Sequence, residues 1–131
     1  MVFTRAEMID IERVDFVALP TRHLGAARRF YGETLGLRRN PHTRDDYPEF
    51  ETGSVTLALH VPPADAEFHP STAVVALRVP DVAAAREKLE AAGVDFDGET
   101  IDTGVCHMAF FTDPDGNALL LHRRYAPVGA S

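Results

Sequence analysis

Hydrophobic and polar positions follow two different periods along this chain. Residues 14–19 are apolar except for Asp15 and have the length of a strand. In residues 24–35 the apolar positions instead recur every three or four residues, which is the spacing of an amphipathic helix. The same criteria predict strands over residues 14–19, 37–40, 48–52, 55–61, 72–79, 96–100, 105–112 and 118–124, and helices over residues 24–35 and 82–92.

Turn-forming residues mark the ends of these elements. Gly36 ends the first helix, and the second lies between an N-capping Asp81 and a C-terminal Gly93. Residues 113–116, Asp-Pro-Asp-Gly, predict a hairpin turn, because proline fixes φ early in the turn and glycine allows a positive φ at its end. Residues 62–71 contain three prolines and no periodicity, so we predict a linker there.

The chain also contains a faint internal repeat. Residues 17–19, Val-Ala-Leu, recur as residues 75–77, and each half offers a strand, a helix and three further strands in the same order. We therefore predict one α+β domain over residues 1–131. It would consist of two tandem βαβββ modules, over about residues 11–62 and 72–125.

Composition and charge narrow the classes of function. The content of 45% hydrophobic and 25% charged residues is that of a globular domain, and no apolar run approaches the roughly 20 residues of a membrane span. The formal net charge of -7 opposes binding to nucleic acid. A single cysteine, Cys106, cannot form an internal disulfide, which favours the cytoplasm. The acidic N-terminal stretch differs from a secretory signal, and we expect a loose arm there.

Two motifs resemble those of a known family. Residues 30–37, Phe-Tyr-Gly-Glu-Thr-Leu-Gly-Leu, are similar to the signature that closes the first helix of the vicinal-oxygen-chelate superfamily, which includes glyoxalases, bleomycin resistance proteins and extradiol dioxygenases. Residues 113–117, Asp-Pro-Asp-Gly-Asn, are similar to its conserved turn. The resemblance implies a curved, mixed eight-stranded sheet that forms a cup, with helices outside, and a homodimer. It implies no single reaction, because this fold hosts several lyases, dioxygenases and antibiotic-binding proteins.

Enzymes of that family hold a divalent metal with His or Glu from the first and last strands of each module. The motifs place these four positions at Phe16, Ala58, Val74 and Leu120. Phenyl and alkyl side chains have no lone pairs with which to bind a metal, so we expect no metal cofactor. A shift of one residue would exchange Phe16 for Asp15, but Phe16 aligns with Val74 at the spacing of the repeat.

Side chains alternate between the two faces of a strand, so residues two positions from these four should also face the cup. The resulting lining would be mostly apolar with a few polar groups, as small-molecule sites usually are. The predicted ligand-binding residues are Phe16, Ala18, Phe50, Thr56, Ala58, His60, Val74, Arg78, Met108, Phe110, Leu120 and His122, with Ala76 and Ala118 on the same face.

Several polar residues have both a functional and a structural interpretation. His60 and His122 occupy equivalent places in the two modules and could orient a ligand, transfer protons or hold a displaced metal, or could simply end strands near solvent. Arg78 could bind a carboxylate or phosphate, or could lie outside the cup. Adjacent Cys106 and His107 face opposite ways and do not easily form a catalytic pair. We predict a buried structural thiol at Cys106, with His107 directed toward the helices or a partner subunit.

Together these features favour metal-independent binding of a small apolar or aromatic molecule, with sequestration as in a bleomycin resistance protein. The main alternative is a metal-dependent glyoxalase-type lyase, isomerase or dioxygenase with relocated ligands, namely His60, His122 and a carboxylate such as Glu49 or Asp15. A third hypothesis is a structural domain whose cup is collapsed. We assign no catalytic residue, and we expect a cytoplasmic homodimer that binds neither nucleic acid nor membranes.

Overall fold

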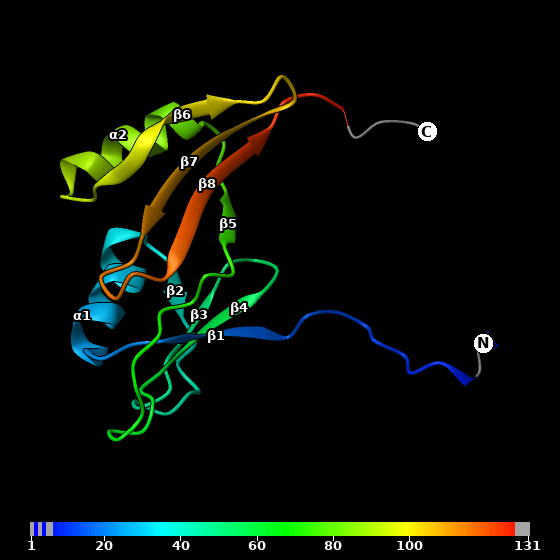
Figure 1. Ribbon diagram of the computed structural model, residues 1–131, viewed down its shortest axis with the longest axis vertical. Helices are drawn as coiled ribbons and strands as arrows, with labels where there is room; N and C mark the ends of the chain where they lie inside the picture. Colours follow the sequence, from blue (N-terminus) through cyan, green and yellow to red (C-terminus); the bar gives the residue numbers. More distant parts are fainter. Residues whose placement is uncertain (1, 3, 5–6, 128–131) are drawn as a thin grey trace.

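The computed structural model describes residues 2, 4 and 7–127, and Figure 1 shows two modules placed one above the other. The first module contains β1 (Phe16–Pro20), α1 (Leu24–Arg29), the π-helix η2 (Phe30–Thr34), β2 (Arg38–Arg39), β3 (Glu49–Glu51) and β4 (Thr56–His60). The second contains β5 (Val75–Arg78), α2 (Val82–Ala91), β6 (Phe96–Asp102), β7 (Cys106–Thr112) and β8 (Ala118–Arg124).

Each module forms its own four-stranded mixed sheet. The strand orders are β1-β4-β3-β2 in the first sheet and β5-β8-β7-β6 in the second. In both sheets the first strand of the module runs parallel to the last, and the other pairs are antiparallel. The predicted α+β architecture of two tandem βαβββ modules is confirmed. Since β1 and β5 each have one neighbour, each leaves one edge without a strand partner in the part of the chain described.

Most element bounds lie within a few residues of those predicted. Asp81 caps α2 by accepting a hydrogen bond of 3.0 Å from the backbone N–H of Ala84. The predicted helix over residues 24–35 is instead a short α-helix that continues as the π-helix η2, and Gly36, with φ of 72°, follows it. The strand predicted over residues 37–40 is reduced to the two residues of β2.

The helices cover one face of each sheet and leave the other face open. Leu57 and Leu59 of β4, with Leu119 and Leu121 of β8, lie in one hydrophobic cluster that also contains residues of both helices. Alternate residues of the same strands must therefore face the other way. Figure 1 shows α1 and α2 on one side of the molecule and the N-terminal segment extending from the opposite side. We call the two uncovered faces the open faces.

The two motifs that resemble family signatures meet in a buried polar network between the modules. The Tyr31 hydroxyl and the Asn117 side-chain amide both donate to Asp113 Oδ2, each at 2.7 Å. Asp113 Oδ1 accepts from the backbone N–H groups of Asp115 and Asn117, each at 2.9 Å. The Asn117 amide also donates to the backbone oxygen of Pro20 at 2.8 Å. This Asp113 network joins the first helix and β1 to the turn between β7 and β8.

The Asp113 network predicts a loss of stability at alkaline pH. Burial, and then the neighbouring Asp113 carboxylate, raise the pKa of Tyr31 above its ordinary value of 10.0. Above about pH 10 the unfolded chain releases this proton while the folded chain retains it, so the free energy of unfolding falls as the pH rises. Urea titrations across this range should show a decline that is shallower in Tyr31→Phe by up to about 1.4 kcal/mol per pH unit. Equal slopes would contradict the assignment of this proton to Tyr31.

Candidate functional site

The open faces hold most of the side chains that the sequence predicts for ligand binding. Strand register places Phe16 beside Thr56 and Ala18 beside Ala58 in the first sheet. In the second sheet Arg78 pairs with His122, which in turn pairs with Met108. In the same sheet Ala76, Leu120 and Phe110 form the adjacent row. His60 lies at the end of β4, beside Pro20. Within one chain these two sets line separate sheets.

Phe50 lies on the other side of the sheet, and its predicted place in the cup is wrong. The Phe50 side chain is 2% exposed, lies in the hydrophobic core and packs against Tyr31, with ring centroids 6.1 Å apart. It pairs with core-facing Leu57, so strand alternation directs its neighbours Glu49 and Glu51 to the open face. The polar-apolar-polar pattern of β3 was the signal for this orientation.

At the four positions where the family resemblance implies metal ligands, the side chains have no electron-pair donor for a metal ion. Phe16 is 59% exposed, and Ala58 and Leu120 present only alkyl groups there. Val74 precedes β5 rather than lying within it. Over residues 2, 4 and 7–127, no group of three or more His, Cys, Asp or Glu side chains is arranged to hold a metal ion. The side chains at the four inferred metal positions therefore cannot coordinate a divalent cation.

The two open faces differ in their charged side chains. Glu49, Glu51 and Asp15 border a polar hollow of about 390 Å³ at the first sheet, and Thr56 donates a hydrogen bond of 2.8 Å to Glu51. At the second sheet Arg78 is the direct strand neighbour of His122. The first sheet therefore presents the carboxylates of Glu49 and Glu51 beside an Arg13–Asp15 ion pair of 3.2 Å, and the second presents a guanidinium beside an imidazole.

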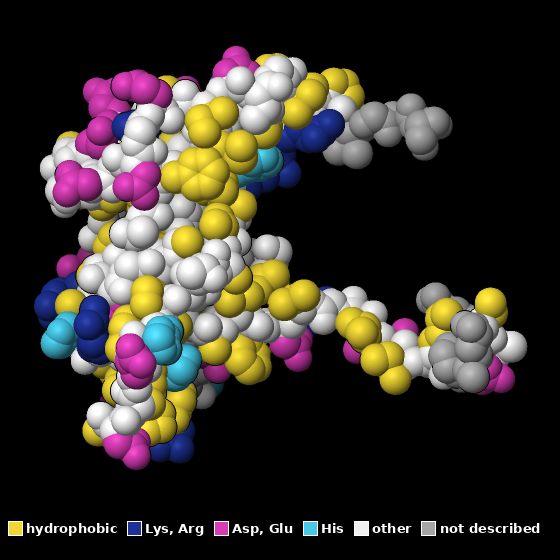
Figure 2. All heavy atoms as spheres, viewed as in Figure 1, with side chains coloured by type: hydrophobic (Ala, Val, Ile, Leu, Met, Phe, Trp, Pro, Cys, Tyr) yellow, Lys and Arg dark blue, Asp and Glu magenta, His cyan; other side chains and the backbone are white. Residues whose placement is uncertain are grey.

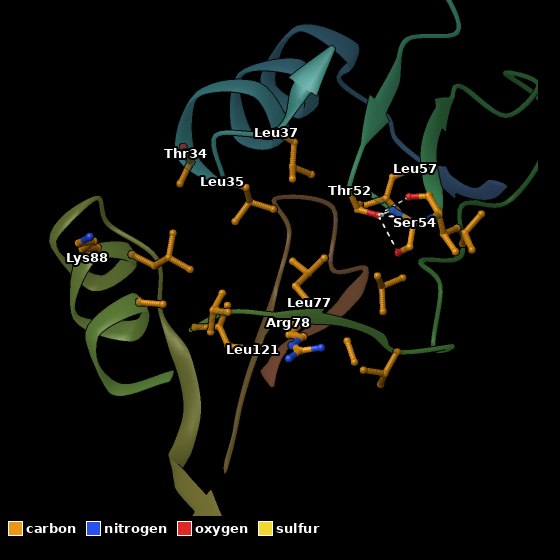
Figure 3. Close-up of a pocket in the computed structure, with 18 residues that line it drawn as sticks. Thr34, Leu35, Leu37, Thr52, Ser54, Leu57, Leu77, Arg78, Lys88 and Leu121 are labelled. Carbon is orange, nitrogen blue, oxygen red and sulfur yellow. Dashed lines mark hydrogen bonds between the residues drawn. The ribbon is translucent and has the colours of Figure 1, made fainter. Parts of the chain in front are cut away.

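A larger cavity lies between the modules, at the free edge of β5. It has a volume of about 620 Å³, and Figure 3 shows the side chains that line it. We call it the junction cavity. Its lining consists of Val17, Thr34, Leu35, Leu37, Thr52, Ser54, Val55, Leu57, Val74, Val75, Ala76, Leu77, Arg78, Val79, Ala85, Lys88, Leu89 and Leu121. The lining is mainly aliphatic and contains no carboxylate, although the chain as a whole has more acidic than basic residues.

Two connections of the first module contribute to the wall of the junction cavity. Leu35 and Leu37 come from the segment after η2, and Ser54 and Val55 come from the turn between β3 and β4. Of the predicted ligand-binding residues, the junction cavity includes only Val74 and Arg78, and it also includes Ala76, which was predicted to share their face. The others lie on the open faces or, in the case of Phe50, in the core. Sequence periodicity did not indicate the junction cavity, since it reports the faces of single elements and not the spacing between modules.

The cationic groups of the junction cavity are available to a ligand. Arg78 and Lys88 have no ion pair with an acidic side chain within the described ranges. Arg86, by comparison, contacts Glu90 at 3.5 Å. In Figure 3, Lys88 projects from α2 at one end of the cavity, and Arg78 lies beside β5. The cavity therefore combines apolar walls with two cations near its rim.

Cys106 and His107 lie at the far end of the second sheet. Cys106 is buried, as predicted, and its sulfur lies 3.2 Å from the Thr103 hydroxyl. His107 stacks on Tyr125 with ring centroids 4.9 Å apart and lies 3.5 Å from the Asp102 carboxylate. Hydrogen bonds from the Gly104 backbone and the Tyr125 hydroxyl lower the pKa of Asp102. The sulfur and the imidazole thus have separate surroundings.

Comparisons with known proteins identify relatives of this architecture. No described helix is long and apolar enough to cross a bilayer. The chain is similar in structure to a putative glyoxalase family protein from Bacillus anthracis (21% identity, 89% of this chain and 98% of that chain, TM-score 0.75). It is also similar to TnmS3, an antibiotic binding protein from Streptomyces sp. (26% identity, 89% and 99% covered, TM-score 0.73). A third similar structure is a lactoylglutathione lyase from Agrobacterium tumefaciens (18% identity, 86% and 94% covered, TM-score 0.70).

A search of curated proteins finds no match to the chain. A family model, described as the Glyoxalase/Bleomycin resistance protein/Dioxygenase superfamily, matches residues 13–121. This match extends from the start of the first module into β8 and includes both motifs identified in the sequence. The chain belongs to the glyoxalase/bleomycin resistance protein/dioxygenase superfamily.

Proposed function

We propose that this protein binds a small, largely apolar organic molecule in the junction cavity and needs no metal to do so. The observation that carries the proposal is an aliphatic cavity of about 620 Å³ bounded by both modules. That volume lies within the range of roughly 300–1,000 Å³ that is usual for small-molecule sites. The wide aliphatic walls favour an aromatic or alicyclic ligand, because burying apolar area is the dominant source of affinity there.

The polar groups of the junction cavity would orient such a ligand. Arg78 and Lys88 at the rim favour a polar substituent that accepts hydrogen bonds or carries a negative charge. The Thr34 hydroxyl offers a neutral donor or acceptor on the opposite wall. One relative, TnmS3, is an antibiotic binding protein by name, which supports binding as a function of this architecture, whereas another is a lyase.

A fragment screen tests the proposal directly. Naphthalene derivatives suit it, because the chain contains no tryptophan and ligand fluorescence is therefore free of the main intrinsic background. We expect saturable binding, with amide NMR shifts concentrated at Leu35, Leu77 and Leu89. The absence of detectable binding by any member of a diverse aromatic library would contradict the proposal. Shifts confined to the open faces would place the site elsewhere.

Metal content distinguishes the proposed function from a metal-dependent enzyme. Such an enzyme would need relocated ligands such as His60, His122 and Glu49, which are distributed over the two sheets of one chain. We expect elemental analysis of untagged protein to find no stoichiometric zinc, nickel, manganese or iron. Stoichiometric metal that is lost in His60→Ala or His122→Ala would favour the lyase or dioxygenase alternative.

We also propose that the protein is a cytoplasmic homodimer without nucleic-acid or membrane partners. Membership of the family supports dimerisation, since the resemblance to that family implies a homodimer. The net charge of -7 opposes nucleic acid, and the free thiol of Cys106 is compatible with a reducing compartment. Native mass spectrometry at physiological ionic strength should find two copies.

A further inference from the structure

The segment of residues 8–14, which we call the arm, carries apolar side chains that are exposed to solvent. Ile9 is 81% exposed and Ile11 is 74% exposed. No backbone hydrogen bond joins the arm to any other residue that the structure describes. Figures 1 and 2 show it extending away from the body of the protein, with hydrophobic side chains along it. Exposed apolar side chains gathered along one segment are a feature of surfaces that contact another molecule.

The sequence of the arm alternates as a strand does. Ile9 and Ile11 would lie on one face of an extended chain, and Asp10 and Glu12 on the other. Seven extended residues span roughly 23 Å, which is longer than the four-residue strand β5. Over residues 9–12 the arm therefore has the pattern of a strand whose two faces differ, one aliphatic and one acidic, whereas Met8, Arg13 and Val14 lie outside that pattern.

The free edge of β5 has complementary properties. The backbone N–H of Val79 donates to His122 in β8 at 3.1 Å. Alternate residues of a parallel ladder bond to the same neighbour, so the peptide groups of Ala76 and Arg78 point to the free edge. Neither has a backbone partner elsewhere in the described chain. Every residue from 74 to 79 lines the junction cavity, so this edge runs along it.

We propose that the arm of a second copy of this chain adds as a strand to the free edge of β5. Both faces of the two strands would then match. Ile9 and Ile11 would lie beside Val75 and Leu77, on the helix-covered side of the sheet. Asp10 and Glu12 would lie on the open side, beside Arg78, in a cavity whose lining holds no carboxylate to repel them.

Photo-crosslinking tests this placement without assuming a strand register. The full chain would carry p-benzoylphenylalanine at Ile11, and isotope-labelled and unlabelled copies would be mixed before irradiation. We expect crosslinked peptides of mixed isotope content that join the arm to residues 74–79. The same photoreactive group at Asp65, in the exposed linker, is the matched control and should not label β5. Attachment only within one chain, or only at other elements, would overturn the proposal.

Charge reversal provides a second, independent measurement. Arg78→Glu should weaken dimerisation by roughly tenfold in analytical ultracentrifugation, because it places a carboxylate beside Asp10 and Glu12. Combining it with Asp10→Arg and Glu12→Arg should restore the dimer. An unchanged dissociation constant in Arg78→Glu, or a triple variant no tighter than the single one, would overturn the proposal.

The arm would occupy part of the proposed ligand site, so this inference rests on the proposed function. Ligand binding and docking of the arm can nevertheless be tested separately. A chain shortened by residues 2–12 keeps the whole lining of the junction cavity. It should bind a naphthalene probe at least as tightly as the full chain, while losing affinity for a second copy. Weaker probe binding in the shortened chain would overturn competition between arm and ligand. Probe binding with no crosslink to β5 would overturn the arm proposal alone.

Discussion

Asp113→Ala should lower the free energy of unfolding by about 3 kcal/mol or more, the largest stability effect expected from a single polar residue of this protein. The Asp113 side chain is 4% exposed and accepts four hydrogen bonds, from Tyr31, Asp115 and twice from Asn117. Alanine would leave these donors buried without partners, and each unpaired donor costs about 1–3 kcal/mol before the structure relaxes. Urea denaturation monitored by circular dichroism measures the loss.

Two milder variants should lower the free energy of unfolding by smaller amounts. Tyr31→Phe removes one donor together with its polar atom, so its cost at neutral pH should be near 1 kcal/mol. Asp113→Asn retains one acceptor oxygen and should fall between the other two. Asp65→Ala, in the exposed linker, serves as the control for loss of a carboxylate and should be nearly neutral. A loss in Asp113→Ala no greater than in Tyr31→Phe would show that the Asp113 network does not hold the modules together.

The residues that identify the family therefore have a structural role in this protein. Tyr31 belongs to the first motif, and Asp113 and Asn117 belong to the second. Their hydrogen bonds join the two modules, and residues of both modules line the junction cavity. This explains why both motifs specify the fold and leave the chemistry open.

The sequence predicted the elements well where the signal was local. Asp81 caps α2, residues 118–124 form β8, and Asp113 begins a hairpin turn, because capping, alternation and proline geometry act within a few residues. The π-helix η2 escaped prediction, since a wider turn leaves nearly the same apolar residues on one side. Phe50 was misplaced when it was assigned to the cup with Met108 and Phe110 as a third-strand residue, whereas the alternation of β3 gives the correct face.

The site was harder to predict than the fold. The open-face positions of Phe16, Ala58 and Leu120 follow from strand parity, and the structure bears out that parity. The junction cavity depends instead on how two modules separated by a linker approach each other. That approach is set by the Asp113 network and by shared core packing, and neither has a period in the sequence. Hence two of its residues, Val74 and Arg78, were named for a different reason.

Two alanine-to-tryptophan substitutions can distinguish the junction cavity from the open faces as the ligand-binding site. Ala85→Trp should reduce the affinity for a naphthalene probe by roughly tenfold or more, the largest effect expected on binding. Ala85 lies on α2 in the wall of the junction cavity, where an indole would fill space that the ligand needs. Tryptophan is compatible with a helix, and Ala85 is half-buried rather than part of the fully buried core.

Ala18→Trp is the matched control, because Ala18 is an exposed residue of the open face on β1. It introduces the same side chain outside the junction cavity, so probe affinity should stay within about twofold of the unmodified chain. Fluorescence titration measures both variants, and circular dichroism verifies that each is folded. If Ala18→Trp abolished binding while Ala85→Trp did not, the ligand would belong to the open face. Equal losses in two folded variants would mean that one ligand contacts both surfaces, which a cavity confined to the module junction does not allow.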